Sequence, residues 1–501
     1  MASGHASATT SAAKTTRDAL PARIIDELRR ILGSDGVLDR YEDLLVYEYD
    51  AYIDRALPQV VVRPTSGAQV AAVVQLAARE QLAVTPRGGA SGLSGGMIPV
   101  EGGILVDLNL MYRVLEVDIE NGLALVEPGV INLDLSTEVA PLGLYYAPDP
   151  SSQKTSTIGG NIAENAGGPH CLSHGMTTNH VVGLELITQD GLLCYPGGKA
   201  PDAPGYDLVG LTVGSEGTFG IVTQAWVRLL ALPPLTVTFL AAYDTVEAAG
   251  TAVSSLVASG VVPAALELMD EPAIAALDRA FNVGYPPGAG AILLIDVDGI
   301  PEAVEEQSER VQRICQETPG CMGVQYAGTQ AERDKLWAAR KGALAACARV
   351  APNYYLCDGT VPPSQLAQVL GTVKRIGQHY DVKILTVAHI GDGNLHPIIG
   401  FDALEEGIMP RVEAAHDELV EACVAAGGTI TGEHGVGLEK RKYMPLIFTP
   451  DDMARMALVR DAFNTTGLFN PGKVLPEPGV APARVAIPVG VAAAVGPGVW
   501  V

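Results

Sequence analysis

The sequence predicts an α+β protein with two domains, and two observations support this fold class. From Val60 to about residue 230, short runs of β-branched residues alternate with helical spacing and glycine-rich loops. After Pro233 and Pro234 the pattern changes to longer apolar strands and amphipathic helices. A chain of 501 residues is also long enough for two or three domains with a large cleft.

The first domain is expected to open with a helical cap. Ile24 and Leu28 lie on one helical face, and Gly33 ends the run. The elements expected next are a strand at 60–62, a helix at 69–78, a strand at 82–85, a glycine-rich loop, and strands at 103–108 and 123–126.

The second domain is expected to be an α+β sheet that helices cover on one face. A strand at 237–242 precedes a helix at 246–257, and a buried strand at 292–297 precedes a charged helix at 302–314. A later helix at 411–425 places Val412, Leu419 and Cys423 on one stripe, and two glycines end it.

The two ends of the chain differ from the rest. The first twenty residues are rich in Ala, Ser and Thr and lack the apolar core of a secretory signal. Pro488 and Pro497 interrupt the apolar C-terminal stretch, which argues against a membrane span. The expected division is a disordered tail (1–20), the first domain with its helical cap (21–235), a substrate domain (236–445), a segment packing back on the first domain (446–475) and a flexible tail (476–501).

Charge and cysteine content exclude several classes of protein. A formal net charge of -24 repels nucleic acid and anionic membrane surfaces, so neither is an expected partner. An anionic substrate would then need a local cation or a metal for its capture. The seven cysteines have neither CxxC pairs nor the spacing of an iron–sulfur site, which favours a reducing, cytoplasmic location.

The densest motif is a loop at 86–96 that holds five glycines in eleven residues directly after a predicted strand. Such a loop lets backbone N–H groups converge on a diphosphate, because no Cβ atom blocks the approach. It is not a Rossmann G-x-G-x-x-G motif, since no ribose-binding acid is evident after a following strand. The loop therefore predicts a dinucleotide site of another kind.

Two further segments have the composition of cofactor walls. Residues 147–168 are rich in small and hydroxylated side chains that can donate along a ribityl chain and a flavin edge. A loop connection explains their composition equally well. Residues 214–223 lead from a glycine turn into a strand and can flank an adenine.

In this order and spacing, the three segments resemble the FAD-binding domain of the vanillyl-alcohol oxidase and p-cresol methylhydroxylase superfamily. The resemblance covers about residues 57–230 and implies a two-subdomain fold that binds FAD. His170 is not expected to bond the flavin covalently. The FAD-binding residues that it implies are Arg87, Gly88, Gly89, Ala90, Ser91, Gly92 and Ser94 at the pyrophosphate, Pro150, Thr157, Gly160, Asn161 and Asn165 nearer the flavin, and Gly217, Ile221 and Val222 beyond.

A second group of candidates lies in the C-terminal half. A predicted strand delivers His389, a turn follows, and His396 begins the return, so that a hairpin brings the two imidazoles together. Some thirty residues later another strand delivers Glu433 and His434. Two His and one carboxylate can bind a divalent metal and leave positions open for substrate, although isolated His residues are more often structural.

The motifs A-H-I-G-D-G-N-L-H-P and G-E-H-G-V-G resemble the C-terminal domain of FAD-linked 2-hydroxy-acid dehydrogenases, such as the glycolate oxidase flavoprotein subunit and D-lactate dehydrogenase. The resemblance implies an antiparallel substrate (cap) domain in which His389, His396 and Glu433 bind Zn²⁺ or a similar metal. It implies that His434 is the base that takes the hydroxyl proton while hydride passes from C2 to flavin N5. Asp392 and Asn394 are expected to orient the His ligands.

The resemblance also bears on the substrate. Arg340 matches an Arg that binds the substrate carboxylate, which suits its planar, two-pronged donor. Relatives that act on 2-hydroxyglutarate carry polar residues where this chain has Leu356 and Ile398. The expected substrate is thus a small 2-hydroxy acid of the glycolate or D-lactate type.

Two other functions fit the residues: a metal-dependent hydrolase that uses the His/Glu cluster, and a non-catalytic flavin electron carrier. The expected partners are the hydroxy acid and an electron-acceptor subunit, such as an iron–sulfur protein. Such a partner is the one route by which the protein is expected to lie peripherally at a membrane.

Overall fold

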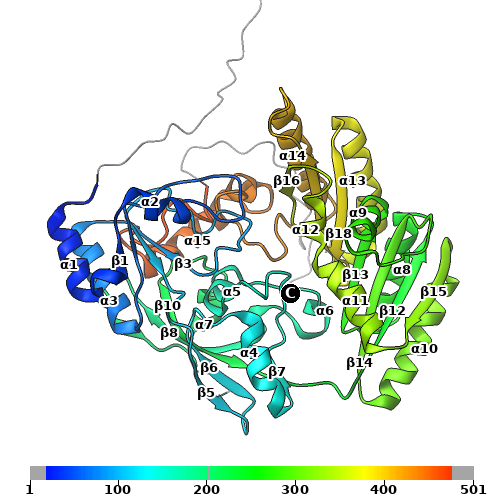
Figure 1. The fold of residues 1–501 in the computed structure, drawn as a ribbon, viewed down its shortest axis with the longest axis horizontal. Coiled ribbons are helices and arrows are strands. Elements are labelled where there is room, and N and C mark those ends of the chain that lie inside the picture. Colours follow the sequence, from blue (N-terminus) through cyan, green and yellow to red (C-terminus); the bar gives the residue numbers. More distant parts are fainter. Residues whose placement is uncertain (1–18, 201–203, 477–501) are drawn as a thin grey trace, which may run out of the picture.

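The computed structural model describes residues 19–200 and 204–476 of the chain. The tails predicted at 1–20 and 476–501 therefore lie almost wholly outside the described residues. Figure 1 shows two lobes, with the elements up to β10 in one and the elements from β12 to α14 in the other. Among the described residues, no helix is both long enough and apolar enough to cross a membrane.

The first lobe begins with a small mixed sheet in the order β1-β2-β4-β3. Its central strands are parallel, and the three valines at 60–62 are buried, as expected for a strand covered on both faces. Ser66 caps the main covering helix by accepting a hydrogen bond from the Gln69 N–H. The bounds are α1 (Ala22–Leu32), β1 (Val37–Leu38), α2 (Tyr41–Leu44), β2 (Val60–Val62), α3 (Gly67–Glu80), β3 (Val84–Arg87) and β4 (Ile104–Asp107).

A second sheet of the same lobe is antiparallel, in the order β5-β6-β10-β8-β9. Residues of β10 alternate between buried and more exposed, and the strand contributes to two cores: Ile221 packs with α3, whereas Ala225 and Val227 belong to a second core. The bounds are β5 (Val114–Asp118), β6 (Leu123–Val126), α4 (Asn132–Val139), β7 (Leu144–Tyr145), α5 (Ile158–Glu164), α6 (Cys171–His174), β8 (Val181–Ile187), β9 (Leu193–Cys194), α7 (Leu208–Thr212), β10 (Ile221–Arg228) and β11 (Leu230–Ala231).

The second lobe is built on an eight-stranded antiparallel sheet with the path β15-β12-β14-β13-β18-β19-β16, and β17 pairs with β19. The strands are β12 (Leu235–Tyr243), β13 (Ala265–Asp270), β14 (Ala291–Gly299), β15 (Cys321–Ala327), β16 (Asn353–Leu356), β17 (Gly359–Thr360), β18 (Lys383–His389) and β19 (Asn394–Phe401). The helices are α8 (Val246–Ala258), α9 (Glu271–Phe281), α10 (Pro301–Glu317), α11 (Gln330–Lys341), α12 (Ala343–Cys347), α13 (Leu366–Tyr380) and α14 (Ile408–Ala425).

The expectation that helices cover only one face of this sheet was wrong. Along β12, Phe239 and Ala241 belong to a core with α8, α10 and α13, whereas Leu240 and Ala242 belong to a core with α9 and α12. Both faces are apolar because successive side chains of a strand point to opposite faces, and each face packs on helices. The run of buried residues in β14 has the same cause.

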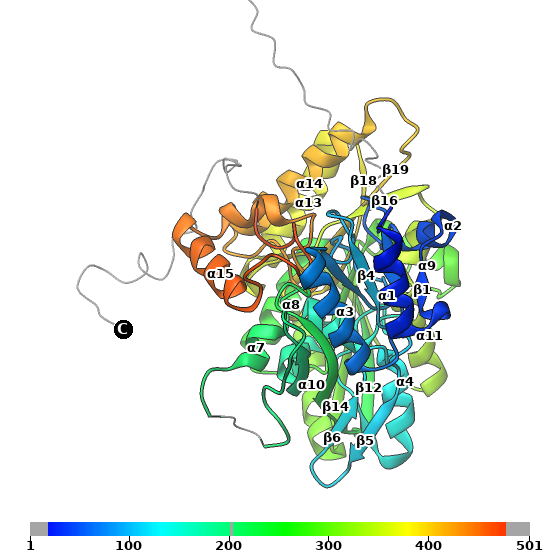
Figure 2. The same cartoon turned by 90° about the vertical axis from the view of Figure 1, so that its left-hand side faces the viewer.

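After α15 (Pro450–Phe463) the chain lies against the first lobe (Figure 2). The Phe463 ring stacks on Phe219 with centroids 4.7 Å apart, and Phe469 bridges to Val84 of β3. Asn470 Nδ2 donates to the carbonyls of Gly96 and Glu216. These contacts connect the last described residues to the glycine-rich loop of the first lobe.

Candidate active site

A cavity of about 450 Å³ lies between the two lobes. On one side it is lined by the glycine-rich loop at 88–92 and by residues 155–157 and 159–161. On the other side it is lined by Arg340, His396 and the Glu433–His434 pair. Segments from both halves of the sequence therefore meet at one site.

Most of the predicted cofactor residues line this cavity: Arg87, Gly88, Gly89, Ala90, Ser91, Gly92, Pro150, Thr157, Gly160, Asn161 and Gly217. The absence of side chains at Gly88 and Gly89 is required by packing. A Cβ on Gly88 would collide with Thr157 Oγ1, and one on Gly89 would collide with the Thr155 carbonyl. The two segments thus pack closely against each other, and the glycine-rich loop can present its backbone N–H groups to a ligand.

Four predicted cofactor residues do not line the cavity. Ser94 is fully buried, and its carbonyl accepts from the N–H groups of Leu438 and Glu439. Asn165 ends α5 in the left-handed region, where its side chain accepts from the Thr178 N–H. Ile221 and Val222 begin β10 and pair with β8.

Arg87 lines the cavity, but its guanidinium donates to the carbonyls of Val46, Tyr47 and Tyr49.

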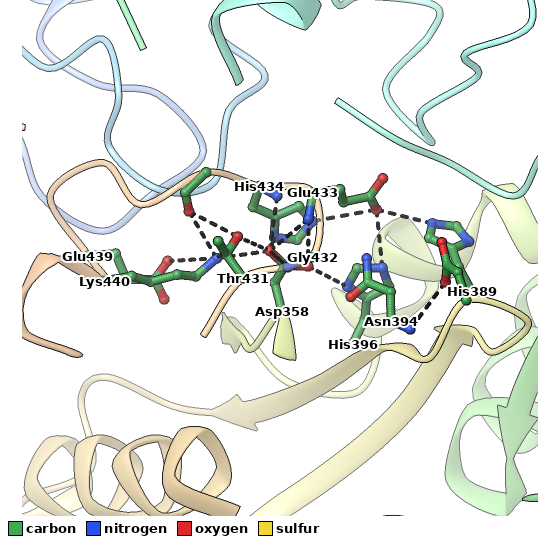
Figure 3. Close-up of polar contacts among 12 residues, drawn as sticks. Asp358, His389, Asn394, His396, Thr431, Gly432, Glu433, His434, Glu439 and Lys440 are labelled. Carbon is green, nitrogen blue, oxygen red and sulfur yellow. Dashed lines mark hydrogen bonds and ion pairs between the residues drawn. The ribbon is translucent and has the colours of Figure 1, made fainter. Parts of the chain in front are cut away.

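The β18–β19 hairpin brings the two predicted imidazoles together (Figure 3). The ring centroids of His389 and His396 are 5.0 Å apart, and their planes are nearly perpendicular. Glu433 Oε1 lies 3.1 Å from His389 Nε2 and 3.2 Å from His396 Nε2. These ligand atoms can hold one metal ion between them.

The two turns that carry these residues are braced by groups that the sequence analysis missed. The Asp358 carboxylate, between β16 and β17, accepts from the N–H groups of Gly432 and His434 at 3.1 and 2.9 Å. It also forms a fully buried ion pair with Lys440 at 3.0 Å. Nothing in the local sequence of Asp358 distinguishes it from a loop acid, and only the fold places it under the 432–434 turn.

Glu267 of β13 was also missed. One of its oxygens accepts from His389 Nδ1 at 2.7 Å, and the other lies 2.5 Å from Arg340 Nη2. Glu267 thus orients His389, a role that had been expected of Asp392 and Asn394. Asp392 instead accepts from the Asn394 N–H within the hairpin turn.

The pKa values of Glu433, His389 and His434 are shifted in different directions by burial and by neighbouring charges. Burial opposes ionisation of Glu433, but His389 and His396 hold its pKa well below the ordinary value. Burial would lower the pKa of His389, but Glu267 and Glu433 raise it well above the ordinary value. Burial lowers the pKa of His434 to about 4, although Asp358 opposes the shift. His434 is therefore a neutral imidazole near pH 7 and able to accept a proton.

Comparison with known proteins assigns the family. The family described as FAD linked oxidases, C-terminal domain, matches residues 232–474, and the FAD binding domain family matches residues 58–194. The glycolate oxidase subunit GlcD of Escherichia coli is 43% identical over 456 residues, which span 90% of this chain and 91% of that protein. The chain belongs to the FAD-linked oxidases. It is an FAD-dependent oxidoreductase, as the motifs predicted.

Other relatives of this FAD-linked oxidase agree with the predicted fold. A D-lactate dehydrogenase of Anaerostipes hadrus is 30% identical over 89% of this chain and 94% of that protein. A crystal structure of p-cresol methylhydroxylase with substrate bound has a TM-score of 0.76 at 16% identity, covering 90% of this chain and 96% of that one. The predicted vanillyl-alcohol oxidase and p-cresol methylhydroxylase type of FAD domain, joined to an antiparallel second domain, is confirmed.

Proposed function

We propose that this FAD-linked oxidase converts a small D-2-hydroxy acid, of the glycolate or D-lactate type, to the corresponding 2-oxo acid. One observation carries the proposal: Glu433 and His434 of the second lobe line the same cavity as the glycine loops of the FAD lobe. The names of its relatives, a glycolate oxidase subunit and a D-lactate dehydrogenase, support this substrate class.

The lining of the cavity on the first-lobe side supports FAD binding there. The 88–92 loop is proposed to hold the pyrophosphate, because it lines the cavity and a glycine-rich loop can present backbone N–H groups to phosphate. The 155–161 segment, which lines the cavity beside it, is proposed to hold the flavin edge. Bound FAD would accept hydride at N5, and a bound divalent metal, Zn²⁺ among the candidates, would lower the pKa of the substrate hydroxyl.

The residues present fit a divalent metal. Because Glu267 accepts from Nδ1 of His389, the Nε2 of that imidazole is directed at the Glu433 carboxylate. Glu433 Oε2 has no hydrogen-bond partner among the described residues, so this buried oxygen has capacity for a ligand. We assign His389, His396 and Glu433 as the ligands.

His434 and Arg340 are proposed to act on the substrate itself. The neutral imidazole of His434 takes the hydroxyl proton, and its ring lies 5.1 Å from that of His396, nearly parallel to it. Arg340, 3% exposed and lining the cavity, binds the substrate carboxylate. A fixed cation at this position counteracts the repulsion of an anionic substrate by the acidic protein.

The substituent on C2 is proposed to face an apolar wall. Leu356 of β16 and Ile398 of β19 are directly paired across the sheet, and both line the cavity. Leu344 and Val387 line it beside them. A second carboxylate on the substrate would be desolvated against this wall without a partner, which favours hydrogen or methyl at this position.

The two electrons must then leave the reduced flavin for an acceptor. The seven cysteines lack the spacing of an iron–sulfur site, so we propose that a partner subunit, such as an iron–sulfur protein, supplies the acceptor.

The test is to mix the yellow protein anaerobically with glycolate, D-lactate, L-lactate or D-2-hydroxyglutarate and to measure the visible absorbance of the flavin. Bleaching by glycolate or D-lactate is expected. A protein that is yellow but bleached by none of the four acids would support the electron-carrier alternative. A colourless protein with hydrolase activity would support the other alternative.

A further inference from the structure

Glu216, which the proposed reaction does not use, connects the two lobes at the active site. It lies in the first lobe, in the turn before β10, and is 4% exposed. Its Oε1 accepts from the Val436 N–H and its Oε2 from the Gly437 N–H, both at 2.7 Å. A carboxylate of the FAD lobe thus binds backbone donors directly beyond the Glu433–His434 pair.

Together with Asp358, Glu216 holds the whole 432–437 turn. The Asp358 carboxylate accepts the N–H groups at the start of the turn, including that of His434, and belongs to the same lobe as the turn. Glu216 accepts the N–H groups at the end of the turn and belongs to the opposite lobe. Glu216 therefore contributes to the position of the turn relative to the FAD lobe, together with the Ser94 carbonyl, which accepts from the N–H groups directly after the turn.

The backbone of Glu216 is itself fixed to the FAD lobe. Its N–H donates to the Ala163 carbonyl of α5 at 2.8 Å, and its carbonyl accepts from Asn470 Nδ2 at 2.7 Å. Its φ of +52° is uncommon for a residue with a side chain, so these contacts hold a conformation that an unconstrained Glu would rarely adopt. Because the Glu216 carboxylate is fixed in the FAD lobe, the turn that it binds is held in a fixed position relative to that lobe.

The fit around the turn leaves little space for movement. Gly435 lies between the two sets of bonds with φ +80°, and a Cβ there would collide with the Glu164 carboxylate and lie 3.0 Å from Glu216 Oε1. Val474, near the C-terminal end, also donates its N–H to the Gly437 carbonyl.

We propose that Glu216 is a positioning residue: by binding the N–H groups of Val436 and Gly437, it sets where Glu433 and His434 lie in the cavity relative to the glycine-rich loop of the FAD lobe. The inference rests on the proposed function, because that function gives His434 its role. The contact of Glu216 with Val436 and Gly437 is independent of the proposed function. A shift of the reacting groups by ~1 Å is enough to slow a reaction about 100-fold.

The test compares Glu216→Gln with wild-type holoenzyme. The amide keeps the volume but places an NH2 group against one of the two backbone donors. Hydrogen–deuterium exchange of the peptide that contains 436–437 is expected to rise roughly 10-fold. The limiting rate of anaerobic flavin reduction by glycolate or D-lactate is expected to fall about 100-fold, with bound FAD and reduction by dithionite unchanged.

The matched control is Glu185→Gln, which removes a carboxylate of the same lobe whose partners, Thr223 and Gln224, also belong to that lobe. It should alter neither the exchange at 436–437 nor the reduction rate. Unchanged exchange in Glu216→Gln overturns the inference, as does raised exchange with an unchanged reduction rate. If no hydroxy acid reduces even the wild type, the proposed function fails, while the exchange result alone still decides whether Glu216 holds the turn. If Glu216→Gln loses FAD, Glu216→Asp, which tolerates the left-handed backbone, replaces it under the same criteria.

Discussion

Glu267 and Arg340 form a buried ion pair of 2.5 Å, and the same carboxylate accepts from His389 Nδ1 at 2.7 Å. One acid from the middle of the second sheet therefore fixes both the proposed carboxylate-binding cation and a proposed metal ligand. Because Glu267 is fully buried, neither partner can exchange it for water without a large cost.

Glu267→Gln is expected to reduce the free energy of unfolding by about 3–5 kcal/mol, because the buried Arg340 then lacks its counter-charge. Urea unfolding measures this change. Glu405→Gln is the control, since it breaks an exposed ion pair with Arg411 and should cost less than about 1 kcal/mol. Equal, small losses in both variants would show that Glu267 does not stabilise the site.

His434→Gln is expected to keep FAD but to lower the limiting rate of flavin reduction by about 10²–10⁴-fold, the usual contribution of a general base. Stopped-flow absorbance measures the rate. Exposed His379, changed to Gln, is the control and should have no effect. The pKa of His434 is about 4, and only its neutral form can accept the proton. Protonation of His434 should therefore lower the wild-type rate of flavin reduction only as the pH falls toward 4. A fall centred near pH 6.5 would contradict this assignment.

Removal of metal by a chelator is expected to abolish flavin reduction by hydroxy acid while the yellow colour remains. The reason is that the proposed ligands, His389, His396 and Glu433, lie beside the cavity and are distinct from the FAD-binding loops. Readdition of Zn²⁺ or another divalent ion should restore the rate, and metal analysis should find about one ion per chain lost in His389→Ala. Full activity in a protein shown to contain no metal would contradict the ligand assignment.

Asp50→Asn is expected to change how stability depends on pH. Burial raises the pKa of Asp50 to about 6, and its Oδ2 has no hydrogen-bond partner among the described residues. The folded protein thus holds the proton more tightly than the unfolded chain, so ionisation costs stability as the pH rises from about 4 through 6. Relative to wild type, the variant should gain about 2–3 kcal/mol between pH 4 and pH 7.5, measured by urea unfolding at both values. The control is Asp26→Asn at an exposed position, for which the stability difference from wild type should not vary with pH. The same pH-independent difference in Asp50→Asn would contradict the prediction.

The motifs predicted most of the cavity, because each is a local pattern with a local physical cause. Gly88 and Gly89 are glycines since any Cβ would meet the neighbouring segment, and a dense glycine loop is readable without knowing that segment. The hairpin from His389 to His396 is equally local, because a short turn between two strands pairs its flanking residues. The expectations for Ser94 and Asn165 placed them at the cofactor, but their side chains do not line the cavity.

Short motifs were enough to predict two kinds of site, one of glycines and one of His and Glu, because backbone freedom and ligand chemistry belong to individual residues and short spacings. Only the packing of the two lobes shows that both sets of residues line one cavity, and which acids support them. Glu267, Asp358 and Glu216 lie far along the chain from the groups they bind. Their roles come from burial beside a particular donor, and burial is a property of the packed fold rather than of any segment.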